Sequence, residues 1–350
     1  MASRISFASA LRHMAMAALL MALAGAATAL RAEEAISPAL RTSATPALDL
    51  AVGWRQPPLE ARTRCWWWWL NGNVTAEAIT RDLEAMKAKG LGGANIIDAN
   101  GADQRNNRPV PHGPDFASPQ WRRLFLHALR EADRLELELG FNIQSGWNLG
   151  GPRTPAEDAA KKLAFSSLDV QGPAAVQQNM PAPPVVGDYY QDVALLAIPL
   201  PDDGAELTRI AGYEQKTYDK YPGAFTAGDA SHLLDAPPVA PGAPVIAMGA
   251  VVDVTARLDA QGRVAWDAPP GRWRLLRIGY TLAGSRVSTQ SDGWDGWAID
   301  YLDPGTFERY WQAIVEPMLA EAGPPVGRSL KFLHTESWEL GPVNWTPRFA

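Results

Sequence analysis

Between residues 64 and 165 the chain alternates apolar runs of strand length with segments in which apolar residues recur at helical spacing. The first run, Arg64–Leu70, reads Arg-Cys-Trp-Trp-Trp-Trp-Leu, and this unbroken stretch predicts a strand buried on both faces. Thr75 is the expected N-cap of the helix that follows, and Gly90 is expected to end it. A second short strand is predicted over residues 93–98.

The same pattern repeats further along the chain. Ser118-Pro119 has the cap-and-proline order that begins helices, and a strand is predicted over residues 139–144. Thr154-Pro155 predicts the start of a third helix. Strands and helices that alternate in this way favour parallel βα units.

From about residue 165 to residue 283 prolines and short apolar runs replace this pattern, which predicts a β-rich insertion. Strands are expected over residues 193–200, 245–254 and 273–280, and a tight turn is expected over residues 267–273.

The βα pattern then resumes. Asp303-Pro304 predicts a helix that runs to about Ala322, and a strand is predicted over residues 329–334. The insertion therefore interrupts one domain. The expected bounds are residues 33–164 for the first βα units, 165–283 for the insertion and 284–350 for the resumed pattern.

Residues 1–32 have the features of a secretory signal peptide. Arg4 and Arg12 supply positive charge, residues 14–29 are apolar, and Ala27-Thr28-Ala29 offers a cleavage site. An uncleaved membrane anchor is the weaker alternative, because the apolar run is short for a spanning helix. We therefore expect a periplasmic or secreted protein. The single cysteine, Cys65, excludes a disulfide within the chain.

Composition narrows the classes of function. The chain has 350 residues, 47% of them hydrophobic, which is enough for a sizeable core. Its net charge of −6 favours neither nucleic acid nor an anionic membrane surface as a partner. Fourteen tryptophans, several beside glycine or asparagine, fit contact with carbohydrate.

The most informative motif lies near residue 340, where Leu-His-Thr-Glu-Ser-Trp-Glu-Leu-Gly occupies residues 333–341 and Asn-Trp-Thr occupies residues 344–346. Sugar-cleaving sites need a carboxylic acid in a partly desolvated pocket, and an indole face stacks on the apolar side of a pyranose. Two carboxylates beside two indoles therefore indicate a glycosidase.

Several motifs together resemble glycoside hydrolase family 106, the α-L-rhamnosidases. The first block is Trp-Trp-Trp-Leu-Asn-Gly-Asn-Val-Thr at residues 67–75, followed by Asp-Leu-Glu-Ala-Met at residues 82–86. Later blocks are Gly-Trp at 146–147 with Gly-Gly-Pro at 150–152, Asp-Tyr-Leu-Asp at 300–303, and His-Thr-Glu-Ser-Trp-Glu at 334–339. The similarity covers residues 60–165 and 295–350.

The resemblance implies a (β/α)8 TIM-type barrel, incomplete in these 350 residues and interrupted by the β-rich insertion. It also implies a calcium ion at the site and inverting hydrolysis of rhamnose-containing glycosides or polysaccharides. The chain departs from the family motif at Glu336, where an aspartate is usual, and at Trp338, where a tyrosine is usual. Family members are longer, so the chain is interpreted as an N-terminal portion.

Glu339 is the predicted general acid, with a solvated loop glutamate or a metal ligand as the alternative. Glu336 is the second candidate for the acid and the candidate ligand for calcium, a cation that prefers carboxylate oxygen. An inverting enzyme also needs a carboxylate base, and residues 1–350 offer no convincing one. His334 is a candidate for sugar contact, or a strand-end histidine bonded to a backbone carbonyl.

Five further residues are candidates for substrate binding. Trp147 and Trp338 are possible sugar platforms, and Asp98 either lines the pocket or caps the following loop. Asn71 and Asn73 either bind sugar hydroxyls or serve the Asn-Gly-Asn turn. The four-tryptophan run is assigned to the core rather than to a binding surface.

Two other functions stay open. The first is a catalytically incomplete fragment or a non-catalytic carbohydrate-binding protein, because the second carboxylate is missing. The second is a periplasmic sugar-binding protein for transport, although the chain lacks the two-lobed βαβ repetition of that class.

Overall fold

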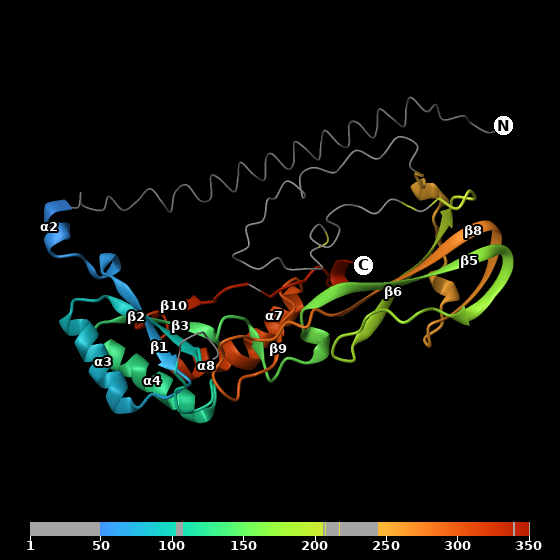
Figure 1. Ribbon diagram of the computed structural model, residues 1–350. Helices are drawn as coiled ribbons and strands as arrows, with labels where there is room; N and C mark the ends of the chain where they lie inside the picture. The colour runs from blue at the N-terminus through green and yellow to red at the C-terminus, as the bar shows by residue number, and fades with distance from the viewer. Residues whose placement is uncertain are drawn as a thin grey trace, which may run out of the picture. The chain divides into compact units, whose positions relative to one another are not determined.

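The computed structural model describes residues 50–102, 108–205, 207, 217, 244–338 and 340–349 (Figure 1). The chain divides into two compact units, residues 1–61 and residues 62–350. The described part of the first contains helix α2 (Leu50–Arg55) and the 3-10 turn η1 (Leu59–Ala61). The predicted signal peptide, residues 1–32, lies outside the described residues. The elements that bear on the site belong to the second unit.

Four strands form a sheet in the order β1-β2-β3-β10, and every neighbouring pair is parallel. The strands are β1 (Arg64–Leu70), β2 (Gly93–Ala99), β3 (Glu138–Ser145) and β10 (Leu330–His334). The strands predicted over residues 64–70, 93–98, 139–144 and 329–334 are confirmed. Because the strands are parallel, their carboxyl ends and the loops that follow them meet at one edge of the sheet.

Helices α3 (Ala76–Ala88) and α4 (Pro119–Arg134) begin at the predicted caps. Thr75 Oγ1 accepts a hydrogen bond from the Ala78 N–H at 3.2 Å, and Ser118 Oγ accepts one from the Trp121 N–H at 3.2 Å. Both helices lie against the same side of the sheet (Figure 1). The core between them and the strands contains Trp69, Leu83, Ile96, Trp121, Phe125, Leu129, Leu139 and Phe141.

The tryptophan run of β1 differs from the prediction. Trp67 and Trp69 are 7% and 0% exposed and pack against the helices, whereas Trp66 and Trp68 are 48% and 44% exposed. Side chains alternate between the two faces of a strand, and the helices cover only one face of this sheet. The prediction of a strand buried on both faces is therefore wrong in the described structure.

A second sheet is antiparallel, in the order β5-β8-β6-β7. Its strands are β5 (Lys161–Asn179), β6 (Tyr190–Leu200), β7 (Val252–Asp253) and β8 (Arg263–Leu282). Figure 1 shows the two long strands β5 and β8 side by side.

Two details of this β-rich segment were not predicted correctly. Of residues 245–254, only β7 is a strand, and the short turns η3 (Met248–Ala250) and η4 (Thr255–Arg257) flank it. Residues 267–273 form no turn, because β8 continues through them and pairs with β5 on both sides of a shift in register. Pro269 and Pro270 lie where this register shifts, which is where residues without an N–H are tolerated in a sheet.

The helix predicted from Thr154-Pro155 is also wrong. Only the 3-10 turn η2 (Ala156–Asp158) forms there. The backbone then becomes extended, because the Ala160 N–H donates to the Ala298 carbonyl at 2.9 Å and Ala159 pairs with Ile299. Nearby, β4 (Gly150–Gly151) pairs with β9 (Trp297–Ala298). Long-range pairing therefore overrides the local helix signal.

The helix predicted from Asp303-Pro304 to about Ala322 is confirmed, with an unpredicted π-helical turn in its middle. It comprises α7 (Pro304–Tyr310), the π turn η5 (Trp311–Val315) and α8 (Glu316–Ala322). The turn η6 (Pro347–Phe349) follows β10.

The architecture is mixed α/β. A closed barrel is not among the described residues, whose parallel sheet has four strands. Within the described part of the chain, no helix is both long and apolar enough to cross a bilayer.

Candidate functional site

The carboxyl edge of the parallel sheet collects most of the predicted site residues. Asp98 lies near the end of β2, His334 ends β10, and Asn71 and Trp147 stand in the loops just after β1 and β3. In parallel α/β sheets, ligands bind at this edge because the loops there are free to vary while the strands hold their ends in place.

A continuous row of aromatic rings runs over the face of the sheet that the helices leave open. The Trp66 ring contacts the His334 ring edge-on, with centroids 5.0 Å apart, and stacks with Trp68 at 5.9 Å. Trp68 in turn contacts Trp147 at 5.7 Å. We call His334, Trp66, Trp68 and Trp147 the aromatic row. Sequence reasoning assigned Trp66 and Trp68 to the core, and only the one-sided helix layer makes them available to a ligand.

The aromatic row borders a cleft of about 320 Å³. Trp68, Leu70 and Trp147 give the cleft an apolar wall, and Thr289 adds a hydroxyl. Arg108 is the charged residue among the described residues that line it. A cleft of this size, with one apolar wall and few polar groups, fits one or two sugar rings.

Polar side chains of β2 and β3 lie on the same open face. Asn95, Asn142 and Gln144 alternate with core residues such as Ile96 and Phe141, so they point away from the helices. Each of the three is less than 9% exposed and carries a side-chain atom with no hydrogen-bond partner among the described residues. Buried polar atoms of this kind favour a polar ligand. The polar-apolar alternation of residues 139–144 is the sequence signal that could have identified them.

His334 and Glu336 lie together beyond the aromatic row. His334 Nε2 is 3.3 Å from Glu336 Oε1, and the side chains are 32% and 18% exposed. The next residue, Thr335, donates its hydroxyl to Gln144 Oε1 at 3.2 Å, which attaches the motif to β3. The predicted acid Glu339 lies outside the described residues.

The described residues do not by themselves fit a calcium ion. Calcium takes six to eight oxygen ligands, whereas Glu336 brings one carboxylate with a histidine as its neighbour. Among the described residues, no group of three or more His, Cys, Asp or Glu side chains converges on a point that could hold a metal. The calcium ion stays a prediction, and no step below depends on it.

Asp98 faces the helices and not the cleft. Its carboxylate is 1% exposed and accepts hydrogen bonds from Trp121 Nε1 at 2.9 Å, Ser291 Oγ at 2.7 Å and Ser145 Oγ at 2.5 Å. Burial raises its pKa to about 6, and the hydroxyl and indole donors oppose that rise. Asp98 therefore holds the loop that contains Ser291 against the ends of β2 and β3. Its described contacts show neither of the two predicted roles, a pocket residue or a cap of the following loop.

The two asparagines of the turn after β1 have different surroundings. Asn71 is 1% exposed, and its amide nitrogen donates to the Val110 carbonyl at 2.9 Å and to Asp292 Oδ2 at 3.0 Å. Its oxygen accepts from the Asp292 N–H at 2.8 Å. Asn71 therefore holds two loops together and has no free polar atom for a sugar. Asn73 is exposed at the turn.

Trp338 extends the aromatic surface on the other side of the motif. It is 56% exposed and meets the Tyr301 ring edge-on with centroids 4.8 Å apart. Asn148 links this region to the loop after β3, because its amide donates to the Ser337 carbonyl at 3.3 Å. The motif at residues 334–338 therefore has the aromatic row at one end and the Trp338–Tyr301 ring pair at the other.

Three comparisons with known proteins bear on the family and the fold of the chain. The model of an α-L-rhamnosidase family, glycoside hydrolase family 106, matches residues 55–200 and 187–350. A protein of Formosa agariphila that carries the name "Putative beta-glucuronidase" is 31% identical over 303 residues, which are 86% of this chain and 25% of that protein. A solved rhamnosidase structure from Novosphingobium sp. PP1Y matches with a TM-score of 0.67 and 24% identity, over 86% of this chain and 40% of that one. The chain thus spans about a quarter of the curated relative and two fifths of the solved structure.

Proposed function

The chain belongs to glycoside hydrolase family 106, and on that premise we propose that the carboxyl edge of its parallel sheet binds α-L-rhamnosides and contributes to their hydrolysis. The observation that carries this proposal is the aromatic row, which leads from an open cleft to the His334–Glu336 pair. Glycosides are the substrate class of the family. That the sugar of this glycoside is rhamnose is part of our proposal.

The row suits a deoxy sugar for a physical reason. Rhamnose carries a methyl group at C5, so one end of its ring is apolar and stacks on indole without leaving a hydroxyl unpaired. Its remaining hydroxyls need hydrogen bonds, and Asn100 and Thr289 bring polar side-chain atoms to the lining of the cleft.

In the proposed reaction, a glutamic acid of the 334–339 motif protonates the glycosidic oxygen as the bond from that oxygen to the anomeric carbon breaks. Water attacks the anomeric carbon from the opposite face and loses its proton to a carboxylate base, which gives inversion. Glu339 is the proposed acid, and Glu336 is the alternative that the described structure places beside the row. The base is not assigned among the described residues, and inverting enzymes place it about 6.5–9.5 Å from the acid.

Further features remain part of the proposal. The four parallel strands with helices on one face are supportive of a (β/α)8 barrel, in which the open face would be the interior. The predicted signal at residues 1–32 supports export to the periplasm or the medium, where a rhamnose-containing polysaccharide or glycoside would be met.

The test is hydrolysis of para-nitrophenyl α-L-rhamnopyranoside by the 350-residue chain, with calcium and with a chelator. We expect Glu339→Gln to lower turnover at least about 100-fold with little change in rhamnose affinity, whereas the same loss in Glu336→Gln alone would make Glu336 the acid. Glu316→Gln, an exposed helix glutamate, is the matched control. Rhamnose binding by the wild-type chain without turnover would favour the non-catalytic function. Wild-type turnover in both Glu339→Gln and Glu336→Gln would remove the two glutamates of the motif from the mechanism.

A second candidate substrate is a β-glucuronide, which the name of the Formosa agariphila relative suggests. Arg108 in the cleft is the observation that favours it, because a guanidinium can bind a uronate carboxylate. We expect Arg108→Gln to weaken a glucuronide about tenfold or more and to leave a rhamnoside unchanged. Equal effects on both sugars would mean that Arg108 does not select a carboxylate.

A further inference from the structure

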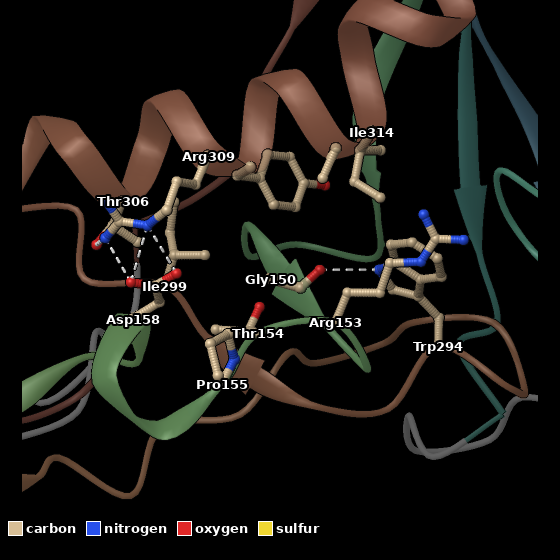
Figure 2. A pocket seen from close by; sticks show the side chains of 12 residues that line it. Gly150, Arg153, Thr154, Pro155, Asp158, Trp294, Ile299, Thr306, Arg309 and Ile314 are labelled. Atoms are coloured by element: carbon tan, nitrogen blue, oxygen red, sulfur yellow. Dashed lines mark hydrogen bonds and ion pairs between the residues drawn. The ribbon is translucent and has the colours of Figure 1, made fainter.

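A second cavity, separate from the cleft, lies between the helical segment of residues 304–322 and the loop that contains β4 (Figure 2). Its volume is about 230 Å³, and it shares no lining residue with the cleft beside the aromatic row. Trp294, Ile299, Tyr310 and Ile314 provide apolar walls, each less than 9% exposed. Arg153 and Thr154 line the side opposite the helix.

The π turn explains how the helix leaves room for this cavity. Pro317 has no N–H, so the Ala313 carbonyl lacks the donor that an α-helix would supply four residues later. The helix widens instead, and the Glu316 N–H donates to the Trp311 carbonyl five residues before it. Ala313 and Ile314, which belong to this turn, line the cavity. π turns of this kind occur frequently at binding sites.

The charges around the cavity are unbalanced. Arg309 is neutralised by Asp158, whose carboxylate accepts from Arg309 Nε at 3.0 Å, and Arg309 also donates to Thr306 Oγ1 at 3.1 Å. Arg153, by contrast, forms no hydrogen bond or ion pair with another described residue. Within the part of the chain that the structure describes, the Arg153 guanidinium therefore stands without a partner at the edge of the cavity (Figure 2).

Size and polarity restrict the ligand. An apolar cavity of about 150 Å³ accommodates benzene, so about 230 Å³ holds one aromatic ring with a short polar substituent. A sugar would place hydroxyls against Trp294, Ile299 and Ile314, and the polar lining residues Asp158, Thr306 and Arg309 are already bonded to one another.

We propose that this cavity binds a small aromatic carboxylate, with the ring between Trp294 and Tyr310 and the carboxylate on Arg153. The ring fills the apolar chamber, and the guanidinium forms a charge-assisted, bidentate pair with the anion. The proposal does not rest on glycosidase activity, and its test involves no glycoside.

The experiment is a titration of the full 350-residue chain with benzoate, followed by ligand-observed saturation-transfer NMR. We expect saturable binding that Arg153→Gln weakens at least about tenfold, because the charge-assisted pair is lost. Ala313→Leu, at an exposed position of the π turn, should fill the cavity mouth and abolish binding. Arg123→Gln, an exposed helix arginine away from the cavity, should leave binding unchanged.

Benzamide separates the charge from the ring, because it has the same shape without the negative charge. We expect it to bind at least tenfold more weakly than benzoate and to be insensitive to Arg153→Gln. Circular dichroism and thermal melting show that each variant is folded. Absence of saturable benzoate binding to the wild-type chain, or equal binding by wild type and Arg153→Gln, would overturn the proposal.

Discussion

Replacing Asp98 with asparagine should change how the stability of the chain depends on pH. Burial raises the pKa of Asp98 from 3.8 to about 6 in the folded chain. Each unit of pKa corresponds to about 1.36 kcal/mol, so the ionised carboxylate lowers the free energy of unfolding by about 3 kcal/mol. Asp98→Asn removes this titration while keeping the shape of the side chain.

The sign follows from which state holds the proton. Below about pH 4 Asp98 is protonated in both states and contributes no pH dependence. Between about pH 4 and pH 6 the unfolded chain releases the proton and the folded chain retains it, so stability falls as the pH rises. Above about pH 6 Asp98 is ionised in both states, so the loss of stability no longer changes with pH.

Urea denaturation followed by tryptophan fluorescence, from pH 3.5 to pH 7.5, measures this effect. The difference in free energy of unfolding, wild type minus Asp98→Asn, should fall by about 3 kcal/mol across that range. Asp267→Asn, an exposed aspartate, is the control and should show no such change. A difference that stays flat, or that rises with pH, would refute the argument that burial dominates the environment of Asp98.

Three further predictions concern the core, a helix cap and the site. Trp69→Ala should lower the free energy of unfolding by about 3–5 kcal/mol because the indole is fully buried, whereas Trp66→Ala should lower it by less than about 1 kcal/mol. Equal losses of stability in urea denaturation would contradict the finding that helices cover only one face of the sheet. Ser118→Ala should cost about 0.5–2 kcal/mol by removing the cap of α4, and an unchanged denaturation midpoint would show that the cap is dispensable. Trp68→Ala should weaken binding of methyl α-L-rhamnoside about threefold to tenfold by calorimetry without changing the melting temperature, and unchanged affinity would exclude the aromatic row as a sugar platform.

Local signals in the sequence predicted elements well where short-range physics decides them. Thr75 and Ser118 are caps because their hydroxyls reach an N–H three residues later, and this geometry needs no partner from elsewhere in the chain. The helix predicted after Thr154-Pro155 failed because Ala160 has a partner almost 140 residues away in sequence. Pairing between such distant segments gives no signal in the residues next to Thr154-Pro155.

The candidate site likewise has features that the sequence predicts and features that it does not. The motif at residues 334–338 and the place of Trp147 could be recognised from residue types and their order, and the parallel sheet brings both to one edge. The roles of Asn71 and Asp98 could not be recognised from the sequence, because their hydrogen-bond partners, Asp292 and Ser291, come from a loop about 200 residues away. Both residues turned out to hold that loop in place.

The sequence by itself determined the four strands of the parallel sheet, the caps of α3 and α4, the family and the motif at residues 333–341, because each depends on residues that are neighbours along the chain. Only the tertiary structure decided which face of β1 meets water, and so which two of its four tryptophans could meet a sugar. Alternation along a strand defines two faces but cannot say which one the helices will cover. That choice depends on how α3 and α4 pack against the whole sheet, and it places Trp66 and Trp68 beside His334 and Trp147.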